Sequence, residues 1–396
     1  MVNLFKYLTY NLLGEKMKKI YLLLLFFLIP LNVSADELNL AENAKSAIMI
    51  EATTGEILYK KNEKERLAPA SMTKIMSLIL IMENIESGKL KWNDIVVTSN
   101  YASSMGGSQV FLKPNEIMSV EDLVKAICVA SANDATVAMA EKIAGTEKAF
   151  VKLMNDKAKE LGTVNTNFVN STGLPAKDHY STAYDMSIMA KELIRHEKIL
   201  SFTKIYEDYL RKNTSNSFWL VNTNKLVRFY DYIDGLKTGF TDDAGYCLTA
   251  TGKKGNMRLI TVVMKEDNTD NRTKDTIAMM DYGFNMYSVK NIISKDNKIG
   301  NIYINLGKEE YADISSLEDI NIVNSNQDNE AKFTYEIETD NVTAPLSKGS
   351  VVGKITVYKD GKYFNSSDLI ITKNIKKANI VKVFFRNIKD VLVGSM

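Results

Sequence analysis

The stretch Ala68-Pro-Ala-Ser-Met-Thr-Lys-Ile-Met-Ser-Leu-Ile-Leu-Ile-Met82 decides the fold, because it joins a serine and a lysine to an apolar run. The run Met72–Met82 predicts a buried helix that opens just after Pro69. Residues three apart on a helix share a face, so we expect the Lys74 amine beside the Ser71 hydroxyl. A lysine with a lowered pKa can take the proton of a serine, and the first-turn N–H of Ser71 can stabilise an oxyanion.

Two later segments supply further polar groups for such a serine. Ser131-Ala132-Asn133 follows an apolar run and offers a hydroxyl and an amide that can hold a peptide carbonyl and the lysine. Lys237-Thr238-Gly239 is typical of a strand edge, with a cation and a hydroxyl for a carboxylate and a glycine that allows close backbone approach. Ser201–Lys204 repeats the Ser-x-x-Lys spacing without such company. The prediction therefore rests on the three segments together.

Each segment also has a plainer explanation. Ser71 and Ser131 are suitable helix caps, and Lys237-Thr238-Gly239 can form a turn. All of these explanations would have to hold at once, which favours a common site. A Ser-His-Asp triad would have to use His179 or His196, the only histidines, and we expect both to be polar surface or capping residues.

Other chemistries find little support in the sequence. Neither a Cys-x-x-Cys nor a His-Glu-x-x-His pattern occurs, and no phosphate-binding loop precedes a helix, so we expect no metal and no cofactor. Cys128 and Cys247 lie in apolar runs, which predicts packed thiols and leaves a disulfide between them open. The formal net charge of +2 gives no footprint for nucleic acid.

The segments and their surroundings resemble the serine-acylating penicillin-binding family, and more narrowly the low-molecular-mass D-alanyl-D-alanine carboxypeptidases of peptidase family S11. The blocks that carry the resemblance follow the family's order, and they are Ala68–Lys74, Ala130–Ala135, Phe168–Pro175, Ser181–Met186 and Lys237–Leu248. The resemblance implies a serine carboxypeptidase that removes the terminal D-alanine from peptidoglycan stem pentapeptides through an acyl-enzyme. It also implies that β-lactams, which mimic the D-Ala-D-Ala terminus, are covalent inhibitors.

The resemblance implies a catalytic role for each matching residue. Ser71 is expected to be the nucleophile and Lys74 the base for acylation, although the identity of that base is disputed across the superfamily. Ser131 would relay a proton to the leaving amine. Asn133 would hold Lys74 and the substrate amide.

The same resemblance implies a binding site for the terminal carboxylate. Lys237 and Thr238 would bind it, and Lys237 would also keep Lys74 neutral by like-charge repulsion. Beside Gly239, the backbone N–H of Phe240 would be the second oxyanion donor; some relatives carry a histidine there, but only the backbone is needed. Arg272 lies where relatives carry an arginine near the carboxylate pocket.

Other functions on this fold stay open. A β-lactamase would share the three segments but must deacylate fast, and no Glu-x-x-Leu-Asn loop is present to position water as in class A enzymes. A D,D-endopeptidase that cuts cross-links shares the chemistry. A catalytically silent cell-wall-binding protein would usually have lost a motif residue, and here all are present.

The N-terminus predicts export. Met17-Lys18-Lys19, the apolar run Ile20–Leu31 and the small-residue end Val33-Ser34-Ala35 form a signal-peptide pattern. We predict a signal peptide over 1–35, with Met17 as a suitable true start; an uncleaved anchor is the alternative, for which the segment is short. The protein would act at the outer face of the cytoplasmic membrane and in the cell wall.

The rest of the chain predicts an α/β catalytic domain over 36–290, with a sheet, a helical subdomain and the active site at their seam. A hairpin at 46–59 precedes helical patterns from 71 to about 196, and strands return at 247–251 and 258–263 before a helix at 275–287. This arrangement resembles that of the penicillin-binding/β-lactamase-like transpeptidase domain. Short alternating strands then predict a small all-β sandwich over 297–373, as at 300–305, 333–337 and 351–357.

The tail, residues 375–396, predicts an amphipathic helix. Apolar residues recur three or four apart, and they are Val381, Phe384, Phe385, Ile388, Val391 and Leu392. Charged residues fall on the other side, and they are Lys382, Arg386, Lys389 and Asp390. This pattern fits an anchor that lies in an anionic membrane surface, as this family often has, and the alternative is a helix packed on its own protein.

Overall fold

The computed structural model describes residues 38–326 and 332–393. The predicted signal peptide over 1–35, including Met17, lies outside the described residues, as do the last three positions of the predicted tail helix.

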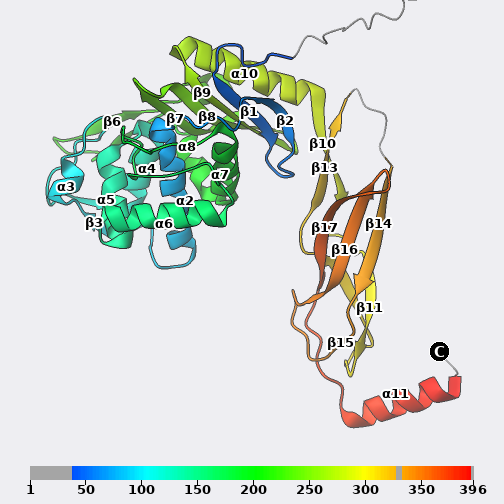
Figure 1. Cartoon of the computed structure of the whole chain (residues 1–396). Coiled ribbons are helices and arrows are strands. Elements are labelled where there is room, and N and C mark those ends of the chain that lie inside the picture. The colour runs from blue at the N-terminus through cyan, green and yellow to red at the C-terminus, as the bar shows by residue number, and fades with distance from the viewer. Residues whose placement is uncertain (1–37, 327–331, 394–396) are drawn as a thin grey trace, which may run out of the picture. The chain divides into compact units, whose positions relative to one another are not determined.

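A five-stranded antiparallel sheet with the order β2-β1-β9-β8-β7 forms the centre of the first domain (Figure 1). Its strands are β1 (Ser46–Glu51), β2 (Ile57–Lys61), β7 (Ile233–Thr241), β8 (Gly245–Lys254) and β9 (Met257–Glu266). The predicted hairpin and the predicted strands at 247–251 and 258–263 are confirmed. The strand β7, which carries the Lys-Thr-Gly segment, lies at an edge of this sheet.

The sheet is covered by helices on both faces, because successive strand residues point to opposite sides. On β1, Ile48 and Ile50 belong to the core shared with the helical subdomain, whereas Ala47 and Met49 belong to the core shared with α10 (Thr269–Met286). Figure 1 shows α10 and α7 (Ala183–Arg195) on opposite faces. The sheet therefore separates two apolar cores.

The helical subdomain surrounds α2 (Lys74–Glu86), whose first nine residues are all buried. A helix that is apolar all round needs such complete enclosure. The longer helices around it are α4 (Val120–Ala130), α5 (Asn133–Ala144), α6 (Glu147–Glu160) and α7. Shorter elements connect them, and these are η1 (Ala70–Thr73), β3 (Ile95–Val97), α3 (Asn100–Ser103), β4 (Ile117–Ser119), η2 (Glu197–Ile199), α8 (Leu200–Thr203), β5 (Glu207–Leu210), β6 (Phe218–Val221) and α9 (Leu226–Phe229).

The second domain is all-β and has its own core, which includes Ile304, Val352 and Leu369. A six-stranded sheet has the order β14-β16-β17-β12-β11-β15, and β10 pairs with β13 in a two-stranded sheet. The strands are β10 (Tyr287–Ile293), β11 (Gly300–Asn305), β12 (Tyr311–Ser316), β13 (Ile320–Ser325), β14 (Phe333–Thr339), β15 (Val342–Thr343), β16 (Val351–Lys359) and β17 (Lys362–Ile371). The three strands named from the sequence are confirmed.

The tail forms the helix α11 (Ile380–Val393). It begins later than the predicted position 375, because Ile375 pairs with Leu346 in a β-bridge and is buried in the core of the second domain. Among the described residues, none of the helices combines the length and the apolar character that a membrane crossing requires.

The sequence predicted the burial of the two cysteines but not that of the two histidines. Both histidines are only 7% exposed, so a surface position is wrong for each, although His196 does cap the C-terminal end of α7. His179 bonds Thr73 Oγ1 at 2.8 Å and accepts from the Val169 N–H at 3.2 Å. Cys128 and Cys247 are buried free thiols, as packing predicts.

Candidate active site

A serine and a buried lysine form the centre of the site. Ser71 lies in η1, the tight turn that precedes α2, and Lys74 is the first residue of α2. The Lys74 Nζ donates to Ser71 Oγ at 2.9 Å and to the Thr172 carbonyl at 2.7 Å. Lys74 is fully buried, whereas Ser71 is partly exposed. The expected neighbourhood of the two side chains is therefore present, with the serine on the solvent side.

The surroundings of Lys74 favour a neutral amine. Burial lowers its pKa well below the usual value for lysine, and the positive charge of Lys237 lowers it further, against the opposite effect of Asp134. A buried ammonium loses its hydration, and a like charge nearby adds repulsion. A neutral amine beside a serine hydroxyl can act as its base.

Ser131 and Asn133 leave buried polar atoms without partners. Ser131 ends α4 in a left-handed conformation with φ of 62°, and its Oγ has no hydrogen-bond partner among the described residues. The Asn133 Nδ2 donates to the Gly106 carbonyl at 2.7 Å, while its Oδ1 is unpaired within the described part of the chain. The expected hydrogen bond from Asn133 to Lys74 is not formed among these residues. Unpaired buried atoms of this kind are costly unless a ligand completes them.

Lys237 and Thr238, two neighbouring residues of β7, contribute a cation and a hydroxyl to the site. Lys237 is 1% exposed, and its Nζ donates to the Thr238 carbonyl at 3.0 Å. Burial lowers the pKa of Lys237 to about 7, and the nearby Arg272 acts in the same direction. The Thr238 hydroxyl donates to Thr223 Oγ1 at 2.7 Å. Thr223 was not predicted from the sequence.

Glycines flank the turn that carries Ser71. A Cβ atom on Gly239 would lie 2.7 Å from the Pro69 carbonyl oxygen, which is too close for any side chain. Gly173, with φ of 88°, is packed so closely that a Cβ atom would overlap the Ala70 carbonyl. The sequence predicted the close approach at Gly239 but missed Thr172 and Gly173. Both residues lie in the block Phe168–Pro175, which carried the family resemblance but was not assigned a role in the site.

A cavity of about 460 Å³ connects these groups. Its lining contains most of the predicted site residues, namely Ser71, Ser131, Thr238, Gly239, Phe240 and Arg272. Lys74 and Lys237 are buried beside it, and Asn133 is not part of its lining. Arg272 projects from α10 and its buried Nε has no partner among the described residues. The Phe240 ring is half exposed and packs on Tyr246, with 4.4 Å between ring centroids.

The site combines a serine, a buried lysine hydrogen-bonded to it and cationic groups, and comparison with known proteins identifies its family. The model of a family described as D-alanyl-D-alanine carboxypeptidase matches residues 32–268. The chain belongs to this family. A second model, described as penicillin-binding protein 5, C-terminal domain, matches residues 287–377. The predicted fold class, a penicillin-binding/β-lactamase-like α/β domain followed by a β-sandwich domain, is confirmed.

Individual relatives cover most of the chain. It is 47% identical over 352 residues to the D-alanyl-D-alanine carboxypeptidase DacF of Bacillus subtilis (strain 168), a match that spans 89% of this chain and 90% of that protein. The crystal structure of penicillin binding protein 5 from Haemophilus influenzae is similar with a TM-score of 0.69 and 30% identity, covering 85% of this chain and 98% of that one. Penicillin-binding protein D2 from Listeria monocytogenes in the cefotaxime-bound form has a TM-score of 0.56 and 32% identity, covering 61% and 97%.

Proposed function

We propose that this protein is a penicillin-binding serine carboxypeptidase that removes the terminal D-alanine from peptidoglycan stem pentapeptides through an acyl-enzyme on Ser71. The observation that carries the proposal is the 2.9 Å hydrogen bond between Ser71 Oγ and the buried Lys74 amine, at a cavity that also holds cationic groups. The 47% identity to a D-alanyl-D-alanine carboxypeptidase supports the same activity.

Acylation begins with a neutral Lys74. The amine takes the hydroxyl proton of Ser71 as Oγ attacks the carbonyl carbon between the two terminal D-alanines. The N–H groups of Ser71 and Phe240 would receive the negative charge on the carbonyl oxygen, and the close approach of β7 at Gly239 to the turn that holds Ser71 supports this.

Collapse of the tetrahedral intermediate breaks the carbon–nitrogen bond. The departing D-alanine nitrogen takes a proton that passes from the Lys74 ammonium through Ser131 Oγ, the buried hydroxyl without a protein partner. An ester on Ser71 remains. Water then attacks the ester, its proton goes to the Lys74 amine, and Ser71 regains its hydroxyl proton as the shortened peptide leaves.

The terminal carboxylate of the substrate identifies the chain end. Thr238 and Arg272 line the cavity and Lys237 is buried beside it, so these residues would offer a hydroxyl and cationic groups to that carboxylate. A β-lactam carries a carboxylate next to a reactive amide, so it would occupy the same groups and acylate Ser71. The cefotaxime-bound relative supports this part of the proposal.

We also propose that the protein acts outside the cytoplasmic membrane. The signal-peptide pattern over 1–35 supports export. Anchoring through α11 is supported by the exposure of its apolar side chains, with Phe384 and Phe385 60% and 65% exposed. Both suggestions go beyond the family assignment.

The activity is tested by incubating the mature chain from Asp36 with a peptide that ends in D-Ala-D-Ala and measuring free D-alanine. Ser71→Ala should reduce the release rate by about 10³-fold or more, because it removes the nucleophile. Ser201→Ala is the matched control, since Ser201 occupies the other Ser-x-x-Lys pattern and donates to the Lys198 carbonyl at 2.7 Å. D-alanine release that survives Ser71→Ala would contradict the proposal.

A cross-linked stem peptide separates the remaining functions. A carboxypeptidase releases D-alanine from the free pentapeptide and leaves the cross-link intact, whereas an endopeptidase cleaves the cross-link. Penicillin labelling of Ser71 without release of either product would indicate a silent binder. Rapid turnover of the label would indicate a β-lactamase.

A further inference from the structure

A second polar cluster lies at the end of α2 that is remote from Lys74. Glu83 and Glu86 come from α2, Glu192 comes from α7, and His196 caps α7. Glu192 and His196 are four residues apart and so share one face of the helix end. Glu83 is nine residues after Lys74, about 14 Å along the helix axis, so the cluster is separate from the serine site.

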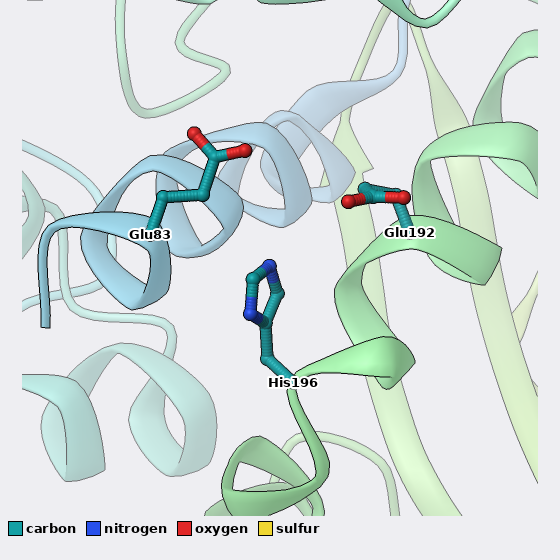
Figure 2. A group of neighbouring side chains, drawn as sticks. All are labelled: Glu83, Glu192 and His196. Carbon is teal, nitrogen blue, oxygen red and sulfur yellow. The ribbon is translucent and has the colours of Figure 1, made fainter. Parts of the chain in front are cut away.

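The cluster has the geometry of a small ion site. One ligand atom each from Glu83, Glu192 and His196 lie within 4.8 Å of one another. Figure 2 shows the His196 ring facing the two carboxylates, which come from different helices. Acidic clusters are common without a bound ion, so the state of His196 decides whether this cluster can bind one.

His196 has one buried ring nitrogen without a partner. The residue is 7% exposed, and its Nε2 has no hydrogen-bond partner among the described residues. A buried nitrogen in this state has lost its hydration without compensation. The unpaired atom therefore needs an explanation, and a ligand between the two carboxylates would supply one.

The other ring nitrogen determines what kind of ligand Nε2 can take. His196 Nδ1 lies 2.8 Å from Glu86 Oε2, and a carboxylate so close favours the tautomer with its proton on Nδ1. In that tautomer of the neutral ring, Nε2 has a lone pair for a ligand, and Figure 2 shows one ring nitrogen turned toward the gap between the Glu83 and Glu192 carboxylates. A histidine that binds a metal through one nitrogen commonly donates its other N–H to a carboxylate.

The charge balance leaves room for a cation. The buried Lys157 ammonium contacts Glu83 Oε1 at 2.5 Å and Glu160 at 2.7 Å. The exposed Arg195 reaches Glu192 at only 3.3 Å. Within the described part of the chain, the carboxylates of Glu83, Glu86 and Glu192 thus outnumber the two cations, Lys157 and Arg195, that contact them.

We propose that His196 Nε2, Glu83 and Glu192 bind a first-row divalent metal ion of the zinc class, with Glu86 orienting the imidazole. Imidazole nitrogen with carboxylate oxygen suits Zn²⁺, which accepts three protein ligands and a water, whereas Ca²⁺ and Mg²⁺ prefer oxygen ligands alone. The metal would join the C-terminal ends of α2 and α7. The role of the metal is structural, because none of the three residues that would bind it lines the catalytic cavity.

The test is a zinc titration of the tag-free mature chain after treatment with a chelator. Calorimetry should show one equivalent of Zn²⁺ bound per chain, with Ca²⁺ and Mg²⁺ as comparison ions that bind far more weakly. The unfolding temperature should rise with zinc by on the order of 5 °C at concentrations well above the dissociation constant. The two cysteines are buried and so do not compete.

Variants identify the ligands. His196→Gln and Glu192→Gln should each abolish stoichiometric zinc binding. Glu86→Gln should weaken zinc binding by on the order of 10-fold. Glu160→Gln is the matched control, because Glu160 shares Lys157 with Glu83 but is not a ligand. Circular dichroism checks that each variant is folded.

Histidine-labelled NMR gives an independent readout, because the chain has only two imidazoles. Zinc should shift Nε2 of one ring and leave the other unchanged, and the shift should disappear in His196→Gln. The proposal is overturned if zinc does not bind, if binding survives His196→Gln, or if Nε2 carries a proton that zinc does not displace. None of these results depends on carboxypeptidase activity.

Discussion

Two buried lysines have different tasks in the proposed mechanism. Lys74 would have to lose its proton to act as a base, whereas Lys237 would have to keep its proton to bind a carboxylate. Burial lowers the pKa of both, and the charge of Lys237 lowers that of Lys74 further. A substrate carboxylate beside Lys237 would favour its charged form. Substrate binding would therefore favour the protonated form of Lys237, which burial alone disfavours.

The dependence of kcat/KM on pH should report both lysines of the free enzyme. It should rise with pH as Lys74 becomes neutral, then fall above about pH 7 as Lys237 loses its proton. In Lys237→Arg the guanidinium keeps its charge, so the fall on the alkaline side should disappear even if the overall rate is lower. The measurement is D-alanine release between pH 5 and 9. An unchanged alkaline limb in Lys237→Arg would assign that limb to another group.

At the scale of elements, the site depends on how closely β7 approaches the turn η1. The motif residues were recognisable from the sequence because their chemistry is tied to residue type, and the Ser71–Lys74 contact followed from their spacing. The second partner of Lys74 was not recognisable, because it is a main-chain carbonyl, Thr172 O, and any residue can provide such a carbonyl. The predicted helix start at 275 lies too far along the chain. The helix α10 begins at Thr269, because the Asn268 side chain caps it by accepting from two N–H groups.

Gly239→Ala tests the close approach of these elements. The new Cβ would lie 2.7 Å from the Pro69 carbonyl oxygen, so β7 or the Ser71 turn has to move. We expect kcat/KM to fall by about 10²-fold, because small displacements of a nucleophile are costly. Steady-state kinetics and penicillin labelling measure the effect.

The control for this substitution is Gly300→Ala, because nothing lies within 4 Å of a Cβ at that position. It should leave both kinetics and unfolding temperature unchanged. Wild-type kinetics in Gly239→Ala would show that the turn can shift without harm, and the contact would then not position the nucleophile.

At the scale of the whole molecule, the chain joins a catalytic domain and a β domain, each with its own core, to the helix α11. The sequence indicated the amphipathic pattern of α11 but not what its basic residues contact. Arg386 is 7% exposed and donates to the Gly307 carbonyl at 3.0 Å, and Lys382 donates to the Lys308 carbonyl at 2.6 Å. These basic groups bind the protein, while apolar groups face outward.

We expect vesicle binding of the mature chain to depend on the aromatic residues of α11. The double variant Phe384→Asp, Phe385→Asp should lower partition into phosphatidylglycerol-containing vesicles by about 10-fold or more, because it removes apolar area that would enter the membrane. D-alanine release from a soluble peptide should not change. Vesicle cosedimentation measures the first effect.

Tyr335→Asp is the control for this pair, because Tyr335 is 64% exposed on β14 and lies outside α11. Its partition should equal that of the wild type. Moderate salt should have little effect on binding, since Arg386 is engaged by its own domain. Unchanged partition in the double variant would indicate that α11 does not anchor the protein.

The position of β7 at the edge of its sheet has a consequence for selectivity. An edge strand presents main-chain donors and acceptors that an extended peptide can pair with. Such pairing does not depend on side-chain identity, so stem peptides that differ in their side chains would be held alike. Selectivity between peptides would then come from the free carboxyl end and from the D configuration of the last two residues. The enzyme would recognise the terminus of a peptide and not its sequence.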